Sequence, residues 1–174
     1  MNYYYSYITP SNFSNIIMTS DGTYLTGLRF IDDDSLIDIN MKFDILPIFQ
    51  ETSKWLDIYF SGKNPHFTPK YKIQTNTNFR KEAIEIIEKI PFGQVLTYSD
   101  IANELAKRRN IKKMSSQAVG GAAHVNPICI IIPCHRVVGK NGKLVGYGGG
   151  INNKAELLKN ENWIVKDLIV SKED

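Results

Sequence analysis

The pattern of hydrophobic and polar positions changes character before the middle of the chain. In the first part, segments rich in Tyr, Ile and Thr alternate with turn residues, as is typical of short β-strands. Three such segments are predicted to be strands: residues 3–9, 14–20 and 23–31. Asp21-Gly22 separates the last two and favours a tight hairpin turn, so we expect an antiparallel sheet.

A helix is expected after this sheet. From Ile45 to Phe60 the apolar side chains recur at the spacing of one helical face, and Gly62 is expected to end the helix. Residues 61–76 contain prolines and scattered polar groups, which predicts a linker. We therefore expect an α+β N-terminal domain over residues 1–75, in which one helix covers a small antiparallel sheet.

The second part of the chain favours helices. Apolar positions over residues 79–90 predict an amphipathic helix, and Asn76-Thr77-Asn78 offers side chains that can cap it. Ser99 is expected to cap a second helix, and Ser115-Ser116 to begin a third. This helix, connector and helix predict a winged helix-turn-helix unit within a helical C-terminal domain over residues 76–174.

The candidate chemistry lies at the end of an apolar run. Ile130-Ile131-Ile132 is predicted to be a buried strand, and Pro133 cannot donate to a ladder, so Cys134 should lie on the turn beyond it. Thiol chemistry uses the thiolate, which a neighbouring His135 can promote by taking the proton. For an arbitrary Cys-His pair, an inert core thiol beside a surface histidine is the commoner case, since neighbours on a strand point to opposite faces.

The composition is typical of a globular protein, with 43% hydrophobic and 22% charged residues among 174. No apolar run approaches the length of a membrane span and the N-terminus lacks the features of a secretory signal, so we expect a cytoplasmic protein without a membrane partner. Five extended residues would hold Cys129 and Cys134 about 17 Å apart, too far for a disulfide, so we expect two reduced thiols.

Positive charge is concentrated in the second part of the chain. The formal net charge is +3. Residues 1–74 hold 6 Lys/Arg against 8 Asp/Glu, and residues 75–174 hold 15 against 10. The surplus therefore lies in the part that contains Cys134, as expected if that part contacts a polyanion.

The segment Pro133-Cys134-His135-Arg136-Val137-Val138 resembles the active-site motif of the O6-alkylguanine-DNA alkyltransferases, the methylated-DNA–protein-cysteine methyltransferases. The resemblance continues in register over residues 79–162, through Ile90-Pro91-Phe92-Gly93, Thr97-Tyr98, Ala118-Val119-Gly120-Gly121-Ala122, Asn126-Pro127, Gly146-Tyr147 and Leu157-Leu158. The first 75 residues match this family in pattern rather than in motif.

The resemblance implies a DNA repair activity. Members of the family swing the damaged guanine out of the duplex and pass its O6-alkyl group to a cysteine, here Cys134. A dialkyl thioether is too stable to hydrolyse, so each molecule would act once. We expect a monomer whose partner is double-stranded DNA containing O6-alkylguanine, with O4-alkylthymine left open. No cofactor is expected, and no metal either, since the first part of the chain offers only His66 as a soft ligand.

The resemblance also implies roles at matching positions. Cys134 would be the nucleophile, His135 its general base through water, and Glu161 the residue that orients the histidine. Asn126 would brace the turn before the cysteine. The guanine pocket would be formed by Tyr98, Val137, Tyr147, Gly148 and Lys154.

DNA contact is expected from the third helix and its surroundings. Gly120-Gly121 costs this helix about 1 kcal/mol per glycine, which indicates that something packs closely against it. In the family this helix lies in the minor groove, and the candidates here are Thr97, Gln117, Ala118, Gly120, Gly121, Ala122 and Arg136. Gln117 departs from the family, many of whose members place an arginine there to fill the gap left by the flipped base.

The connector before the third helix is strongly basic. Its cations are Lys107, Arg108, Arg109, Lys112 and Lys113. Such a cluster suits DNA phosphates but is equally ordinary on a solvated loop. We include these residues among the candidates for DNA binding.

Two other functions fit parts of the sequence. A cysteine hydrolase with a Cys-His-Glu set would turn over repeatedly and would need no basic surface. A non-catalytic module that recognises alkylated bases would need no Cys134, which binding-only relatives lose. The helix-turn-helix with its basic connector argues against the first, and the presence of Cys134 argues against the second.

Overall fold

A computed structural model describes residues 2–31, 40–75 and 77–172, and it confirms the predicted α+β class. Asn76, one of the expected caps, lies outside the described residues. The chain forms two compact units: Met1–Ile73 with Pro127–Cys129, and Gln74–Asn126 with Ile130–Asp174. No helix in the described part of the chain is both long enough and apolar enough to cross a membrane.

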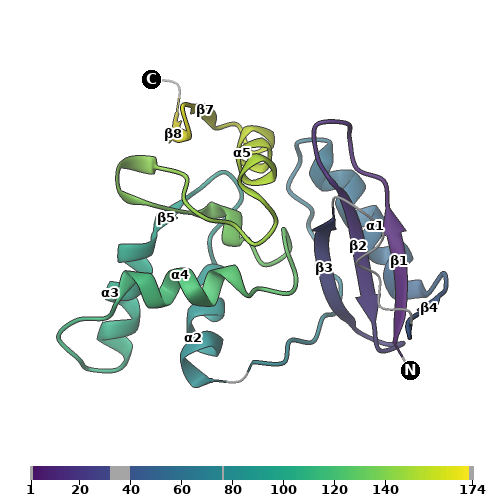
Figure 1. The fold of residues 1–174 in the computed structure, drawn as a ribbon, viewed down its shortest axis with the longest axis horizontal. Coiled ribbons are helices and arrows are strands. Elements are labelled where there is room, and N and C mark those ends of the chain that lie inside the picture. The colour runs from purple at the N-terminus through teal and green to yellow at the C-terminus, as the bar shows by residue number, and fades with distance from the viewer. Residues whose placement is uncertain (1, 32–39, 76, 173–174) are drawn as a thin grey trace. The chain divides into compact units, whose positions relative to one another are not determined.

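Unit 1 contains a small sheet with one covering helix (Figure 1). Its strands are β1 (Tyr3–Tyr7), β2 (Asn15–Ser20), β3 (Leu25–Ile31) and β4 (Lys42–Phe43), in the order β3-β2-β1-β4. The pairs β1–β2 and β2–β3 are antiparallel, as predicted. The short strand β4 was not predicted, and it pairs in parallel with β1. Alternation in β2 buries Ile16, Met18 and Ser20.

Helix α1 (Pro47–Phe60) forms as the apolar spacing predicted. Its buried side chains are Ile48, Phe49, Thr52, Trp55, Leu56 and Tyr59. Phe49 stacks on Tyr5 of β1 with ring centroids 5.9 Å apart. Full burial of each large apolar side chain stabilises the unit by about 1.5–3 kcal/mol. Gly62 follows the helix with φ +78°, which confirms its expected role at the C-terminus.

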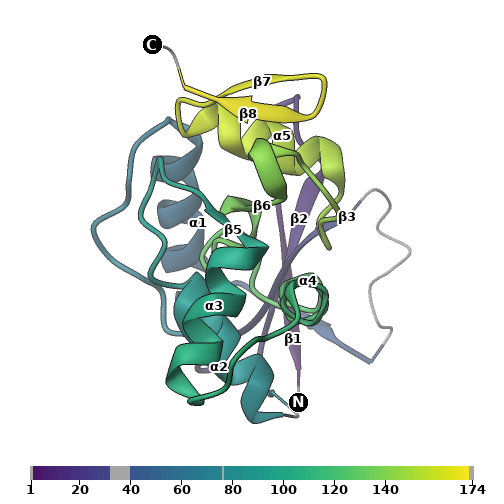
Figure 2. The ribbon, with the colours of Figure 1, turned by 90° about the vertical axis from the view of Figure 1, so that its left-hand side faces the viewer.

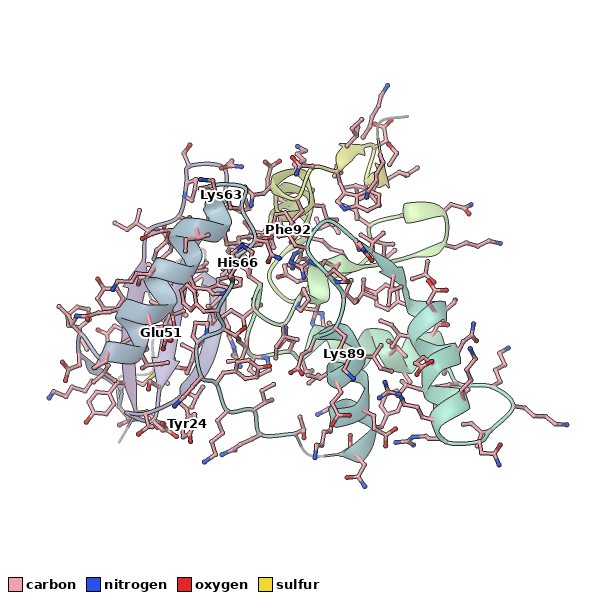
Figure 3. All side chains as sticks on the ribbon, turned by 180° about the vertical axis from the view of Figure 1, so that it is seen from behind. Tyr24, Glu51, Lys63, His66, Lys89 and Phe92 are labelled. Carbon is pink, nitrogen blue, oxygen red and sulfur yellow. The ribbon has the colours of Figure 1, made fainter. Side chains whose placement is uncertain are left out.

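The free edge of β3 is covered by segments from elsewhere in the chain. Tyr71 forms a parallel bridge with Leu25, and Ile128 forms one with Leu28. The Cys129 amide donates to the Leu28 carbonyl at 2.8 Å. These contacts satisfy backbone groups that an open edge would expose. His66, within the segment expected to be a linker, is exposed (Figure 3).

Unit 2 is mainly helical (Figure 2). Its helices are α2 (Asn78–Ile87), α3 (Tyr98–Arg108), α4 (Ser116–His124) and α5 (Ile151–Asn160). Two short strands, β5 (Leu96–Thr97) and β6 (Val137–Val138), pair in parallel. Strands β7 (Ile164–Lys166) and β8 (Ile169–Ser171) form an antiparallel hairpin.

Side-chain caps begin the first three helices of unit 2. Thr77 caps α2 and Ser115 caps α4, as the sequence indicated. The predicted cap of α3 was wrong, because Thr97 rather than Ser99 occupies the N-cap position. Thr97 accepts from the Asp100 amide, and the Asp100 carboxylate accepts from the Thr97 amide at 2.8 Å. This reciprocal arrangement satisfies two amide donors at once, which Ser99 in the first turn cannot do.

The predicted strand Ile130-Ile131-Ile132 is a turn instead. Ile130 has φ +68°, a conformation that β-branched residues rarely adopt. Ile130 and Ile132 are nevertheless buried, so burial rather than strand pairing explains the apolar run. The Ile132 carbonyl accepts a hydrogen bond from Asn126 Nδ2 at 3.0 Å in place of a ladder partner.

The hairpin of β7 and β8 holds the loop that follows β6. The Leu144 amide donates to the Leu168 carbonyl at 2.7 Å. Gly142 has φ +74°, and a Cβ there would lie 2.6 Å from the Val170 carbonyl oxygen. Val170 is buried with Val138, Leu144, Ala155 and Leu158. The hairpin after α5 therefore supports a core cluster.

Gly142→Ala is expected to lower the free energy of unfolding by about 2 kcal/mol, because it combines an unfavourable positive φ with a clash against backbone. Gly121→Ala is the matched control, since Gly121 lies within α4 and a Cβ there meets nothing within 4 Å. Removing a helical glycine should stabilise the protein by about 0.5–1 kcal/mol. Denaturant titration of both variants checks these opposite signs, and equal effects would contradict the tight contact at Gly142.

Candidate active site

Cys134 is the first residue of a 3₁₀ turn, Cys134–Arg136, directly after Pro133. Asn126 Nδ2 lies 2.9 Å from Cys134 Sγ and 3.0 Å from the Ile132 carbonyl oxygen. One amide group therefore bonds both to the turn and to the sulfur. A hydrogen bond donated to sulfur favours the thiolate over the thiol.

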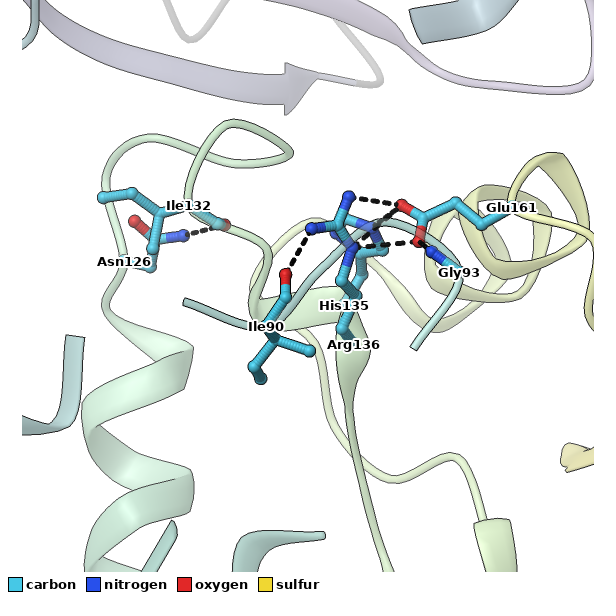
Figure 4. Close-up of polar contacts among 7 residues, drawn as sticks. All are labelled: Ile90, Gly93, Asn126, Ile132, His135, Arg136 and Glu161. Atoms are coloured by element: carbon cyan, nitrogen blue, oxygen red, sulfur yellow. Dashed lines mark hydrogen bonds and ion pairs between the residues drawn. The ribbon is translucent and has the colours of Figure 1, made fainter. Parts of the chain in front are cut away.

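His135 and Arg136 converge on the carboxylate of Glu161 (Figure 4). His135 Nε2 lies 2.7 Å from Glu161 Oε1. Arg136 contacts both oxygens, with Nη2 2.9 Å from Oε1 and Nε 2.9 Å from Oε2. The Gly93 amide donates to Oε2 at 2.9 Å, and Arg136 Nη1 donates to the Ile90 carbonyl at 2.6 Å. The network joins the segment after α2, the turn at Cys134 and the end of α5.

The charges in this network follow from its contacts. Burial acts to raise the pKa of Glu161, but its interactions with His135 and Arg136 outweigh this effect and lower the pKa to about 2. Burial lowers the pKa of His135 despite the opposing effect of Glu161. The Arg136 guanidinium is always charged, so Glu161 remains ionised beside a neutral imidazole. Nε2–H then donates to Glu161, which leaves the lone pair on Nδ1.

Lys154 lies near two aromatic rings, those of Tyr98 and Tyr147. Its Nζ donates to the Val137 carbonyl at 2.6 Å and lies 3.5 Å from the Tyr98 hydroxyl. The same ammonium lies 5.7 Å from the Tyr98 ring centroid and 6.0 Å from that of Tyr147. Burial lowers the pKa of Lys154 to about 8, although the charge of Cys134 acts to raise it. Burial and then the charge of Cys134 raise the pKa of Tyr98 to about 12.

A cavity of about 920 Å³ opens beside α4. Helix α4 contributes Ser116, Gln117, Gly120, Gly121 and His124 to its lining. The other lining residues are Arg80, Tyr98, Ser99, Val125, Gly139, Lys140, Val145 and Gly146. Cys134 does not line it, and Tyr98 is shared between the cavity and the Lys154 cluster. No Asp or Glu is among these lining residues.

Two family descriptions match nearly the whole chain. The 6-O-methylguanine DNA methyltransferase ribonuclease-like domain matches residues 3–71, and the DNA binding domain of the same name matches residues 78–163. The methylated-DNA–protein-cysteine methyltransferase of Methanosarcina mazei is 38% identical, over 90% of this chain and 96% of its own length. The chain belongs to this methyltransferase family. The resemblance inferred from the Cys134 motif is thereby confirmed.

Other relatives of the family give the same result. The enzyme of that name from Haemophilus influenzae is 36% identical, over 91% of this chain and 86% of its own. The crystal structure of Mycobacterium tuberculosis O6-methylguanine methyltransferase has a TM-score of 0.77 and 32% identity, covering 92% of this chain and 93% of that one. Mycobacterium tuberculosis OGT in complex with DNA has a TM-score of 0.76 and 33% identity, covering 91% and 92%.

The residues expected to contact DNA in this methyltransferase separate into distinct groups. Gln117, Gly120 and Gly121 line the cavity, and Ala118 is exposed beside it. Ala122 is only 2% exposed, so its expected surface position was wrong. It follows Gly121 directly, and helical geometry turns it into the core.

Arg136 also requires a correction. We expected it to contact DNA, but it is 8% exposed and its guanidinium bonds to Glu161 and to the Ile90 carbonyl. Thr97, another candidate, uses its hydroxyl in the cap of α3. The adjacency of Arg136 to Cys134 therefore reflects the internal ion pair rather than a surface role.

The five cations of the expected connector are partly neutralised within the protein, and two of them, Lys107 and Arg108, belong to the last turn of α3. Arg109 Nε and Nη2 bond to the two oxygens of Glu82 at 2.9 and 3.1 Å. Arg108 Nε lies 3.2 Å from Glu104. The remaining connector cations, Lys107, Lys112 and Lys113, are exposed. None of the five connector cations lines the cavity.

Sequence reasoning missed several cavity residues. His124 follows Gly120 and Gly121 at helical spacing, so their shared face could have identified it. Arg80 and Lys140 carry no local signal, because only the packing of unit 2 brings them to the cavity. Among the described residues, no group of three or more His, Cys, Asp or Glu side chains is placed to bind a metal ion.

Glu161→Gln is expected to remove a pH-dependent part of the stability. The folded pKa of Glu161 is about 2 against an ordinary value of 4.5, so its ionised form stabilises the fold above pH 4.5, and this contribution is lost as the pH falls towards 2. Between these pH values the wild type should lose about 3 kcal/mol more than the variant.

Denaturant titrations from pH 7 to 2 measure this difference. Glu51→Gln is the control, because Glu51 is an exposed carboxylate on α1 (Figure 3) and its loss breaks none of the ion pairs described in the structure. Its pH profile should follow that of the wild type. A Glu161→Gln profile parallel to the wild type would show that the carboxylate contributes no such linkage.

Proposed function

We propose that this protein repairs O6-alkylguanine in double-stranded DNA by transferring the alkyl group to its own Cys134. The observation that supports this most strongly is the placement of Cys134, bonded to Asn126 and followed by a histidine held on a buried carboxylate, in a chain of the methyltransferase family. The DNA complex of the Mycobacterium tuberculosis relative supports DNA as the partner. We propose that the protein acts as a monomer.

Cys134 supplies the sulfur and His135 the base. The Nδ1 lone pair of neutral His135 accepts the thiol proton through a water molecule. The thiolate attacks the alkyl carbon in line with the bond to O6, so that an S–C bond forms as the C–O bond breaks. The bonding electrons leave on guanine, which takes up one proton. These steps balance without a cofactor.

Nearby groups favour the charge that develops on sulfur. The Asn126 amide donates to Sγ. The Lys154 ammonium and the Cys134 thiolate stabilise each other, as the effect of Cys134 on the pKa of Lys154 indicates. Glu161 holds His135 in the tautomer that this step requires.

The product is a thioether, so the reaction is proposed to occur once per molecule. A dialkyl thioether has no leaving group that water can displace under physiological conditions. Cys134 is therefore not regenerated, and repair is stoichiometric with protein. The same chemistry extends to O4-alkylthymine, which presents an alkyl group on a comparable exocyclic oxygen.

Base flipping is proposed because the alkylated oxygen lies within the base stack, out of reach of a buried thiol. Helix α4 presents Gly120 and Gly121 on the cavity face, where small residues admit the walls of the minor groove. Tyr98 lies between the cavity and Lys154, a place from which it can meet the incoming base.

The guanine pocket is proposed to lie on the Lys154 side of Tyr98. Tyr147 and the backbone groups of Val137 and Gly148 would complete it. A Cβ on Gly148 would lie 2.6 Å from the His124 carbonyl oxygen, so this wall packs directly against the end of α4. Lys154 holds the same wall through the Val145 carbonyl at 3.1 Å.

Cys134→Ala should abolish alkyl transfer while leaving duplex binding unchanged, because the sulfur makes the new bond and contacts none of the expected phosphates. Cys129→Ala is the matched control and should retain transfer. Burial does not distinguish the two thiols, at 4% exposed for Cys129 and 3% for Cys134, but only Cys134 has the neighbours described above. Peptide mapping after reaction that places the alkyl group on Cys129 would overturn the assignment.

Gln117 is proposed to support the extrahelical base as a weaker wedge than arginine. Its amide offers donors and an acceptor to the orphaned base, but it is shorter and uncharged. Gln117→Ala should slow repair of duplex DNA roughly three- to tenfold, since it removes about 0.7–1.4 kcal/mol of contact. Reaction with free O6-benzylguanine should be nearly unchanged, and Gln117→Arg should keep or improve duplex repair.

The ratio of second-order rates on duplex and on free base measures this effect for each variant. The ratio cancels changes in the chemistry at Cys134. If Gln117→Ala leaves it unaltered, Gln117 is a surface residue of α4 and base extrusion depends on other groups.

A further inference from the structure

Two cations give the cavity beside α4 its positive charge. Arg80 and Lys140 belong to its lining, which contains no Asp or Glu. Among the described residues, neither side chain takes part in a salt bridge. Their charges are therefore available to an anionic ligand that occupies the cavity.

Two of the connector cations, unlike Arg80 and Lys140, are paired with carboxylates of the protein. Arg109 is held by two hydrogen bonds to Glu82 and also lies over the Phe79 ring, 5.5 Å from its centroid. Arg108 Nε lies 3.2 Å from Glu104 Oε1, and Arg108 Nη1 lies 3.9 Å from Glu85 Oε2. A phosphate would have to compete with these carboxylates for the two arginines. The most basic stretch of the sequence therefore has less free charge than its composition indicates.

Backbone hydrogen bonds fix the main-chain positions of Arg80 and Lys140, from which the two side chains extend. Arg80 lies in the first turn of α2, where its amide donates to the Thr77 hydroxyl at 3.2 Å. Lys140 is the first residue of a short 3₁₀ turn. A hydrogen bond from the Gly139 amide to the Lys143 carbonyl, 2.7 Å long, closes this turn. The β7–β8 hairpin, which lies beyond the residues matched by the family description, holds the same turn through Gly142. Ligand binding therefore needs to order only the two side chains.

The ligand must be larger than a single anion. The volume of about 920 Å³ exceeds what one phosphate fills and suits nucleotides of a strand. Hydroxyl groups accompany the cations, since Ser99 and Ser116 line the cavity with their oxygens 3.3 Å apart. Cations and hydroxyls are the groups that contact DNA phosphates.

We propose that Arg80 and Lys140 are positioning residues that each pair with one backbone phosphate of the strand entering the cavity, and that these two pairs hold the damaged nucleotide for Cys134. This inference rests on the proposed function. It assigns the main phosphate contacts to the cavity rather than to the basic connector. Each contact releases condensed counterions, so it contributes about 0.9 to the slope of log K against log salt.

The test compares Arg80→Gln, Lys140→Gln and the double variant with the wild type, using fluorescence anisotropy on a duplex from 50 to 200 mM salt. Each single substitution should lower the slope by about 0.9, so that the loss of affinity over this range becomes roughly 3.5-fold smaller, and roughly 12-fold smaller for the double variant. Arg80→Lys and Lys140→Arg retain the charge and should restore the wild-type slope.

Lys112→Gln/Lys113→Gln is the matched control, because it removes two exposed connector charges that do not line the cavity. It should change the slope by less than half as much as the double variant at Arg80 and Lys140. An equal or larger effect of the control, or an unchanged slope in the cavity variants, would overturn the inference.

Reaction with free O6-benzylguanine separates positioning from a structural role. Arg80→Gln and Lys140→Gln should react with it as the wild type does, since the free base has no phosphate. An equal loss on free base and duplex would overturn the inference. If the wild type transfers no methyl group from DNA, the proposed function itself fails; if it does and the slopes are unchanged, only this inference fails.

Discussion

The active site depends on one buried carboxylate. Glu161 accepts from His135, Arg136 and the Gly93 amide, so it holds together segments that are far apart in the sequence. A buried charge is tolerated only with such a complete set of donors, and removing one partner leaves the others uncompensated. The ion pair with Arg136 keeps Glu161 ionised, and the ionised carboxylate fixes the His135 tautomer. The proposed base, His135, is thus oriented by a residue that makes no contact with the substrate in the proposed reaction.

The other cations of unit 2 also differ in whether a carboxylate partner holds them. Cations paired with carboxylates, such as Arg136 and Arg109, stabilise the fold and position its elements. Arg80 and Lys140, which form no salt bridge within the described part of the chain, lie at the cavity. Lys154 is intermediate, since carbonyl groups hold its ammonium while burial lowers its pKa. We infer that the paired cations are structural, and that lining the cavity distinguishes Arg80 and Lys140 from the exposed lysines of the connector.

The sequence predicted what depends on local pattern. The presence of α1 and its end at Phe60 followed from helical spacing, although the helix begins at Pro47 rather than at Ile45. Thr77 and Ser115 were recognisable caps, and the Cys134 motif indicated the family. The expectation for residues 130–132 failed because β-branched residues favour both strands and burial, and here burial in a turn prevails. Pattern cannot separate these two causes.

The candidate site shows the same division. The match to a known family pattern picked out Cys134, His135 and Glu161 together. In the structure, His135 and Glu161 are in direct contact. Arg136 was misassigned because its partner, 25 residues away, is fixed only by tertiary packing. Arg80 and Lys140 were missed for the same reason. No local property of their segments indicates that α2 and the loop after β6 line one cavity.

We propose that the reaction of Cys134 is stoichiometric, because the thiol accepts one alkyl group and is not regenerated. The most direct test incubates the wild-type protein with an excess of duplex DNA containing O6-methylguanine and follows both the intact protein mass and the repaired guanine. The account predicts a gain of one methyl group per protein molecule, with repair stopping at one equivalent. Continued repair by an unmodified protein would contradict it in favour of a hydrolase, and binding without change in either molecule would contradict it in favour of a recognition module.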